Sequence, residues 1–215
     1  FLVPRHFTEI LDDAAPTPGH ELAEYRDRGA YVLLGDPGAG KTETFKQEAS
    51  ATGGLFITAR DFLDLDIRDT WRNTMLFIDA LDESRAGEGD GRTPLSRIRG
   101  KLDQLGRPRF RLSCREVDWL GASDRGALQG LAPDNRIVTL RLEPLAEEQS
   151  LAILRSRPDV PDADAFFATA RERGLAALLE NPQTLHLLAD ALRGEDWPDS
   201  RAKTYDLACR QLVLE

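Results

Sequence analysis

A glycine-rich segment of eight residues constrains this chain more than any other feature of its sequence. Residues 35–42 read GDPGAGKT, which fits the pattern G-x-x-x-x-G-K-[ST], and they directly follow the apolar run Tyr31–Leu34. A short apolar run predicts a strand buried on both faces, and the residues from Lys41 onward predict a helix. Glycines at such a junction let main-chain N–H groups turn inward around an anion, at the positive end of the helix dipole. The segment therefore predicts a phosphate-binding loop, the alternative being a glycine-rich turn that happens to contain a lysine.

The same pattern predicts what the individual residues do. Lys41 would reach the β and γ phosphates of a nucleoside triphosphate, and the hydroxyl of Thr42 would bind Mg²⁺, which bridges the phosphate oxygens. Nucleotide and Mg²⁺ are thus the expected cofactors. The expected nucleotide-binding residues are Gly35, Asp36, Pro37, Gly38, Ala39, Gly40, Lys41, Thr42 and Glu43.

A second apolar run ends in acidic residues. Met75–Ile78 predicts a strand, and Asp79 at its end would contact the Mg²⁺ shell directly or through water. Asp82 and Glu83 follow, where one of them could orient or deprotonate the attacking water. The simpler alternative is an acidic loop after a buried strand. The upstream glycine-rich loop favours a nucleotide site over that alternative.

The remaining pattern predicts an α/β fold. Further strands are expected at residues 55–58, 109–113 and 137–142, which gives a three-layer P-loop sandwich with a parallel five-stranded sheet. Residues 1–9 read as a lead-in and residues 14–19 as a turn. After Glu143 the pattern is helical only, so we expect a P-loop domain at residues 1–143 and a small all-α domain at residues 144–215. Helices are expected at residues 147–155, 163–173, 175–179, 184–192 and 202–214.

Composition argues against several other classes of protein. The chain has 215 residues and a formal net charge of −9, so its field would repel nucleic acid and anionic membranes. No apolar stretch is long enough to cross a membrane, and no signal-peptide pattern opens the sequence. Its two cysteines are too few for a disulfide framework, which fits a cytoplasmic protein. We therefore expect no direct binding to nucleic acid or membrane from this segment.

The two motifs together resemble one family of nucleotide switches. GDPGAGKT and MLFIDALDE are similar to the corresponding motifs of NACHT-type NTPases of the STAND class, including the bacterial ones. In that family the second strand typically ends in Asp, a small residue, a hydrophobic residue and an acidic pair. In most related enzymes the catalytic Glu follows the metal-binding Asp immediately, whereas Ala80 stands there in this chain. The resemblance implies that Asp82 or Glu83 activates water, without choosing between them.

Two further segments match the same family. Residues 109–115 resemble the strand that lies between the two motif strands and carries a sensor arginine, which would be Arg115 pointing at the γ-phosphate; the alternative is a surface arginine. Asn181-Pro182 resembles the motif whose proline packs on adenine. A proline in the first turn of a helix capped by Asn181 is equally consistent with the sequence, and the two interpretations are compatible. Residues 3–5 are a weaker candidate for the other wall of an adenine pocket.

The resemblance implies an ATP- or ADP-binding switch that hydrolyses ATP slowly. In the family, ADP holds a closed form in which a winged-helix domain covers the nucleotide, and exchange for ATP permits self-association. Residue 215 falls where that winged-helix region would begin. Bacterial members often serve antiviral defence, with a trigger that the sequence does not identify. Two alternatives are a AAA+ motor or loader with continuous turnover and a scaffold that binds ATP with little hydrolysis.

Overall fold

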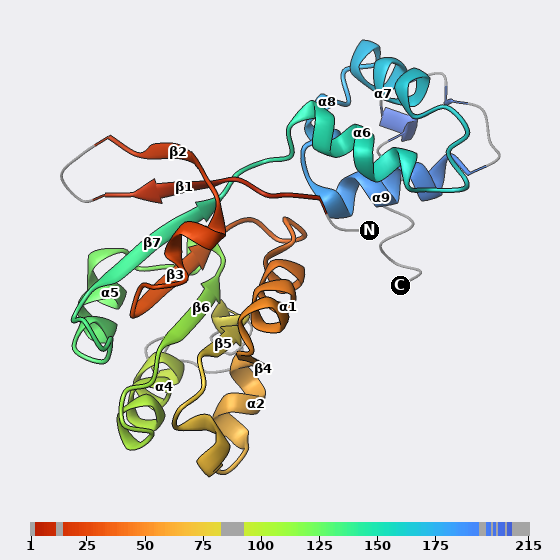
Figure 1. Cartoon of the computed structure of the whole chain (residues 1–215). Helices are drawn as coiled ribbons and strands as arrows, with labels where there is room; N and C mark the ends of the chain where they lie inside the picture. Colours follow the sequence, from red (N-terminus) through yellow and green to blue (C-terminus); the bar gives the residue numbers. More distant parts are fainter. Residues whose placement is uncertain are drawn as a thin grey trace. The chain divides into compact units, whose positions relative to one another are not determined.

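The computed structural model describes residues 3–11, 15–82 and 93–193, together with 197–198, 200, 202–204 and 206–207. The chain forms two compact units (Figure 1). One comprises His6–Glu143, and the other comprises Phe1–Arg5 and Pro144–Glu215. The first residues group with the helical unit and not with the P-loop unit, since Val3 packs on the helical core and the carbonyl of Pro4 accepts a hydrogen bond from Gln149. The chain's described helices include none that is both long enough and apolar enough to cross a membrane.

The first unit contains a mixed sheet of seven strands in the order β2-β1-β7-β3-β6-β5-β4. The five expected parallel strands are present in it, with β3 at the centre between β7 and β6. Strand β6 lies between β3 and β5, as the family resemblance implied. The strands span Phe7–Ile10 (β1), Thr17–His20 (β2), Ala30–Leu34 (β3), Leu55–Thr58 (β4), Leu76–Asp79 (β5), Phe110–Cys114 (β6) and Ile137–Leu142 (β7).

The expectation of a five-stranded parallel sheet was wrong by two strands. Strands β1 and β2 extend the sheet beyond β7, and both β1 pairings are antiparallel. The sequence of β2 is TPGH, whose proline and glycine disfavour strand interiors and indicate a turn. Its exposed residues fit an edge strand, where an unpaired backbone tolerates such residues. The local sequence of β2 therefore indicates a loop, but its pairing with β1 makes it a strand.

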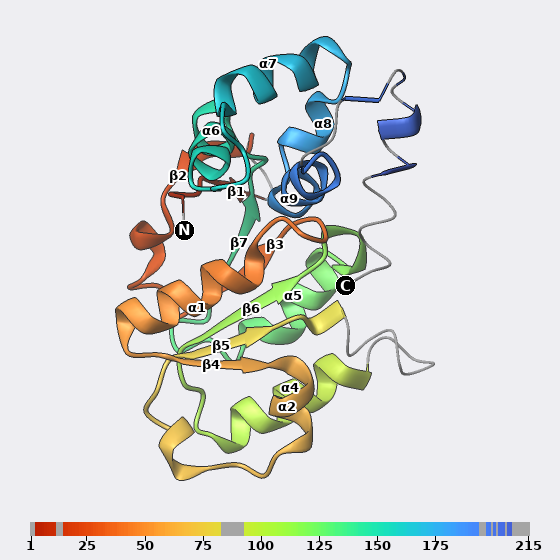
Figure 2. The same ribbon diagram turned by 90° about the vertical axis from the view of Figure 1, so that its right-hand side faces the viewer.

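Successive side chains along a strand point to opposite faces of the sheet, so a hydrophobic core forms on each face. In β3, Ala30, Val32 and Leu34 face one hydrophobic cluster, while Tyr31 and Leu33 face the other. Helix α1 covers the second face, and α2, α4 and α5 cover the first, so the unit has three layers (Figure 2). The helices span Lys41–Thr52 (α1), Ala59–Asp64 (α2), Thr93–Gln104 (α4) and Ala122–Gln129 (α5), with short 3-10 turns at Leu22–Tyr25, Asp69–Trp71 and Glu116–Asp118.

A buried arginine ties the segment before β3 to the sheet. The side chain of Arg111 in β6 is wholly buried and its guanidinium group lies 4.4 Å from the ring centroid of Tyr31. Its N–H groups donate to main-chain carbonyls that include those of Tyr25, Arg26 and Arg28. Burial lowers the pKa of Arg111. Arg111 thereby links the segment before β3 to β6.

The second unit consists of helices around their own apolar core. That core joins side chains of the four helices of this unit whose bounds the structure describes, including Leu154, Phe167, Leu179 and Leu188. The helices span Glu147–Arg155 (α6), Ala163–Glu172 (α7), Ala176–Leu179 (α8) and Pro182–Ala191 (α9). The expected helix at residues 202–214 lies largely outside the described residues.

Candidate nucleotide site

The glycine-rich loop connects the carboxyl end of β3 to the start of α1. Gly38 and Gly40 have φ angles of 71° and 100°, a region that residues with a side chain rarely adopt. At Gly35 a Cβ atom would lie 3.3 Å from Cβ of Leu142, so that position is also tight. The loop needs glycine at these points to turn its backbone toward the space before the helix. This is the local geometry of an anion nest.

The first turn of α1 has donors to offer an anion. Gly40 caps the helix without a side-chain hydrogen bond, and the first N–H groups of a helix have no partner within it. The ammonium group of Lys41 lies over the loop, donating to the carbonyls of Gly35 at 2.7 Å and Asp36 at 3.0 Å. A lysine has three donors, so one remains beyond these two contacts. Lys41 is thereby held in the loop with a donor available for a phosphate oxygen.

The environment of Lys41 also affects its charge. Burial lowers the pKa of Lys41, and the carboxylates of Asp82 and Asp79 act in the opposite direction. A partly desolvated ammonium interacts more strongly with an anion than an exposed one does. Binding a phosphate here would favour the charged form of Lys41.

Three polar side chains meet at the end of β5. The hydroxyl of Thr42, at the start of α1, donates to Oδ2 of Asp79 at 2.7 Å. The hydroxyl of Ser113 in β6 donates to Oδ1 of the same carboxylate, and it accepts a hydrogen bond of 2.8 Å from the amide of Ala80. Asp79 is only 3% exposed. Both of its oxygens are therefore fixed, one by the loop helix and one by the neighbouring strand.

Ala80 turns the chain sharply after β5. Its φ angle is 61°, in the left-handed region that costs residues other than glycine roughly 1–2 kcal/mol. A small side chain limits that cost, and the hydrogen bond from the amide of Ala80 to Ser113 holds the turn. The turn directs the chain away from the end of β5, so that Asp82, three residues after Asp79, contacts the segment after β6.

Asp82 is engaged with the segment that carries Arg115. Its Oδ2 lies 2.8 Å from Nε of Arg115, and its Oδ1 accepts a hydrogen bond of 3.1 Å from the amide of Arg115. The Asp82 side chain is 5% exposed, whereas that of Arg115 is 43% exposed. Asp82 thus anchors the end of β6, and the outer part of Arg115 remains accessible.

Three further predicted site residues are Glu43, Glu83 and Pro182. Glu43 is exposed in the first turn of α1 and forms an ion pair with Lys46 at 2.7 Å. Glu83 lies outside the described residues. Pro182 begins α9 in the helical unit, and Asn181 caps that helix by accepting from the amides of Gln183 and Thr184. The structural interpretation of Pro182 therefore holds, and its contact with adenine stays a prediction.

Ser113 is a polar residue of the candidate site that the sequence alone did not predict. The sequence places Ser113 in the strand that leads to Arg115, and its partner Asp79 is 34 residues away. Once β6 is placed beside β5, the hydroxyl of Ser113 lies level with Asp79 and becomes a candidate hydrogen-bond donor to its carboxylate. The strand order, combined with a polar residue near the end of a buried strand, is the signal that could have found it.

The residues present fit a Mg²⁺–nucleotide complex. Mg²⁺ usually keeps several waters and takes one or two protein ligands plus phosphate oxygens, and a site of that kind needs no cluster of protein ligands. Thr42 and Asp79 offer a hydroxyl and a carboxylate at one point, directly after the loop. Among the residues that the structure describes, no group of three or more His, Cys, Asp or Glu side chains could hold a metal on its own. Any metal bound at Thr42 and Asp79 would therefore depend on oxygens from a ligand or from water.

Comparisons with known proteins fix neither a family nor an activity for the chain. No protein-family model matches it, and no curated protein matches it. Among solved structures, it is similar to the AAA domain of FIGL-1 in complex with ADP, at 17% sequence identity and a TM-score of 0.47. That alignment covers 85% of this chain and 71% of the other.

Proposed function

We propose that this chain is an ATP-binding and slowly hydrolysing switch module of the NACHT-like STAND type. The observation that carries the proposal is the hydrogen bond from Thr42 to Asp79, which joins the end of the glycine-rich loop to the end of β5. A hydroxyl and a carboxylate at this point, beside a loop lysine, suit a triphosphate with its metal. Adenine as the base rests on the family resemblance alone, because the chain has no Asn-Lys-x-Asp motif for guanine.

In the proposed reaction, water attacks the γ-phosphoryl group in line with the leaving oxygen. Bound Mg²⁺ would supply positive charge between the β and γ phosphates. Lys41 would direct its remaining donor to a phosphate oxygen, and Arg115 would contact the γ-phosphate with the exposed part of its guanidinium group. Both side chains would stabilise negative charge that grows on the phosphate oxygens in the transition state.

The contacts of Asp82 favour a division of roles within the acidic pair. Both carboxylate oxygens of Asp82 are engaged by Arg115, so Asp82 suits the role of a positioning residue. A water molecule would have to compete with Arg115 for both oxygens of Asp82. We therefore assign water activation to Glu83.

The proposed output is a change of assembly state. By the family resemblance, ADP would maintain a closed form and ATP would permit self-association, in bacterial antiviral defence, in response to a trigger that remains to be identified. The accessible sensor arginine supports this proposal, because a group that contacts only the γ-phosphate distinguishes ATP from ADP. A continuously working AAA+ motor is the competing proposal, since the same loop and strand end would serve it.

The decisive experiment measures nucleotide binding and turnover together. Lys41→Ala should abolish binding of a fluorescent ATP analogue, and unchanged affinity would refute the phosphate-binding assignment. For the wild-type chain, single-turnover and multiple-turnover hydrolysis should both be slow, with ADP retained after the first turnover. Fast steady turnover would instead identify a motor. Binding without hydrolysis would identify a nucleotide-gated scaffold.

A further inference from the structure

The end of β7 lies beside both parts of the candidate nucleotide site. Strand β7 runs parallel to β3, and Arg141 is level with the last residue of β3, just before the glycine-rich loop. A Cβ atom at Gly35 would lie 3.3 Å from Cβ of Leu142, so β7 also lies close to that loop. Nη1 of Arg141 is 3.6 Å from Oε1 of Glu116, which directly follows Arg115. The last residues of β7 therefore adjoin the glycine-rich loop and the turn that carries the sensor arginine.

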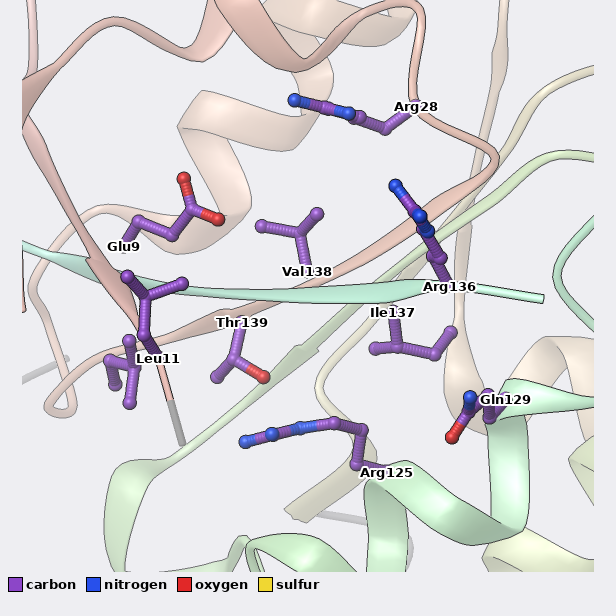
Figure 3. A pocket seen from close by; sticks show the side chains of 10 residues that line it. Glu9, Leu11, Arg28, Arg125, Gln129, Arg136, Ile137, Val138 and Thr139 are labelled. Atoms are coloured by element: carbon purple, nitrogen blue, oxygen red, sulfur yellow. The ribbon is translucent and has the colours of Figure 1, made fainter. Parts of the chain in front are cut away.

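The direction of the Arg141 side chain follows from the alternation along β7. Figure 3, a view of the pocket at the start of β7, shows Ile137 and Thr139 on one side of the strand and Val138 on the other. Arg141 is an even number of residues from Ile137 and Thr139, so it points to the same side, which α5 covers. Glu116 follows β6, and β3 lies between β6 and β7. The ion pair thus spans two strand spacings, roughly 10 Å, across the end of β3.

The turn that contains Glu116 is held at both of its ends. At its start, the amide of Arg115 donates to Asp82 at 3.1 Å. At its end, the amide of Leu120 donates to Oδ2 of Asp124 at 3.0 Å, and Asp124 is only 3% exposed. Glu116 begins the 3-10 turn between these two points. Because the ends are held, a contact made by Glu116 bears directly on its neighbour Arg115.

Two residues beyond Arg141 the chain leaves the P-loop unit. That unit ends at Glu143, whose amide donates to the carbonyl of His6 at 3.0 Å. Oε1 of Glu143 accepts hydrogen bonds from the hydroxyl of Thr8 at 3.1 Å and from the amide of Gly19 at 2.8 Å. The exit of the chain is therefore tied to β1 and β2. A displacement of β7 at Arg141 would act on these hydrogen bonds.

We propose that Arg141 is a positioning residue of the nucleotide site, which holds the turn of Arg115 through Glu116 and carries the presence of a γ-phosphate to the end of β7. The inference rests on the proposed function, in which Arg115 contacts the γ-phosphate of ATP. ADP lacks that phosphate, so it leaves the turn and the ion pair without this pull. An ion pair as exposed as this one, with side chains 44% and 45% exposed, has a small interaction energy. Its loss should therefore change nucleotide preference a few-fold and leave binding itself intact.

Equilibrium binding of ADP and of a non-hydrolysable ATP analogue to the full chain measures this preference. Glu116→Gln and Arg141→Gln should each lower the affinity for the analogue about 2- to 5-fold and leave the affinity for ADP unchanged. The double variant should lose no more than either single variant, because both remove the same contact. Arg141→Lys keeps the charge and should retain most of the wild-type affinity for the analogue.

A matched control removes another exposed ion pair. Asp103→Asn with Arg107→Gln removes a pair at 2.9 Å between side chains 58% and 56% exposed, with the same zero change in net charge as the double variant. Both nucleotide affinities should stay at their wild-type values in this control.

Hydrogen exchange reports whether the effect reaches the end of β7. In the wild-type chain the amide of Glu143, which donates to His6, should exchange at different rates with the ATP analogue and with ADP bound. In Arg141→Gln the two rates should become equal. An unchanged difference in that variant would show that the ion pair does not carry the signal.

Other results would also overturn the inference. Equal losses of ADP and analogue affinity in Arg141→Gln would reduce its role to a structural one, and equal losses in the control pair would remove its specificity. Additive losses in the double variant, or an Arg141→Lys variant as weak as Arg141→Gln, would show that the two charges do not act as a pair. A wild-type chain that binds ADP and the analogue equally, with Lys41→Ala abolishing both, would refute this inference alone. Absence of nucleotide binding in the wild-type chain would refute the proposed function.

Discussion

Ser113 donates a hydrogen bond to the buried carboxylate of Asp79 from the neighbouring strand of the sheet. The same hydroxyl accepts from the amide of Ala80, so it links the carboxylate to the turn that follows it. Because Thr42 holds the other oxygen of Asp79, the direction of the carboxylate is determined from two sides. Ser113 is therefore a positioning residue for the proposed Mg²⁺ site.

Ser113→Ala should weaken Mg²⁺ binding at the site without abolishing nucleotide binding. Removing one hydrogen bond to a charged group costs about 1.5–3 kcal/mol, so the Mg²⁺ concentration for half-maximal hydrolysis should rise about 10-fold or more. Nucleotide affinity measured with a chelator present should stay unchanged. Ser113→Thr keeps the hydroxyl and should restore most of the Mg²⁺ affinity. Wild-type Mg²⁺ dependence in a folded Ser113→Ala variant would contradict this role.

Asp82 and Glu83 should differ in what their substitution removes. Glu83→Gln should retain ATP binding and reduce hydrolysis about 10²–10⁴-fold, as expected for loss of a general base. Asp82→Asn should mainly reduce the preference for ATP over ADP, because it weakens the ion pair that positions Arg115.

Arg115→Gln provides the matching test for Asp82. If the two residues act as a unit, the double variant should lose little more nucleotide discrimination than either single variant. Equilibrium binding of ATP and ADP to all four chains measures this coupling. Additive losses, or loss of hydrolysis in Asp82→Asn with normal hydrolysis in Glu83→Gln, would reverse the assignment.

The turn at Ala80 gives a prediction about stability. With φ at 61°, Ala80→Gly should remove backbone strain and raise the free energy of unfolding by up to about 1 kcal/mol. Ala80→Val should lower it by about 1–2 kcal/mol, since a β-branched residue tolerates this conformation poorly. Urea unfolding of the three chains measures both effects. A valine variant as stable as the wild type would show that the turn relaxes at no cost.

The sequence predicted those parts of the fold that depend on local pattern. Strands β3, β4 and β5 are short, mainly apolar runs that end at polar residues or at the glycine-rich loop, where Gly38 and Gly40 adopt positive φ angles. Strands β1 and β2 escaped prediction because β2 contains proline and glycine, and its pairing with β1 depends on β1 joining β7.

The contacts within the candidate site depend on strand order, which no local pattern contains. Thr42 and Asp79 could be paired from their motifs, since both belong to known positions around a metal. The engagement of Asp82 with Arg115 and of Ser113 with Asp79 requires β6 to lie beside β5. Side chains that are more than 30 residues apart become neighbours only through that arrangement. A sequence reading can name such residues individually, but it cannot pair them.

A histidine in the helical unit should make the stability of that unit depend on pH. Nη1 of Arg157 lies 2.9 Å from Nδ1 of His186, which suits a neutral ring that accepts the hydrogen bond. Burial, followed by the charge of Arg157, lowers the pKa of His186, while Asp190 and Asp159 act in the opposite direction. The unfolded chain therefore binds a proton at a higher pH than the folded chain does.

The direction in which stability changes with pH follows from this difference between the folded and unfolded pKa of His186. The stability contributed by neutral His186 is fully present above the unfolded pKa of about 6.5, and it is lost as the pH falls through the lower folded pKa. The pKa of Asp159 is lowered to about 2, chiefly by its hydrogen bond with Arg157, so that carboxylate stays ionised throughout this range. Hydrogen exchange of α9 amides, corrected for the intrinsic effect of pH, should show a lower opening free energy at pH 5.5 than at pH 7.5. His186→Gln, which cannot titrate, should flatten that slope. An equal slope in both chains would assign the pH dependence to other groups.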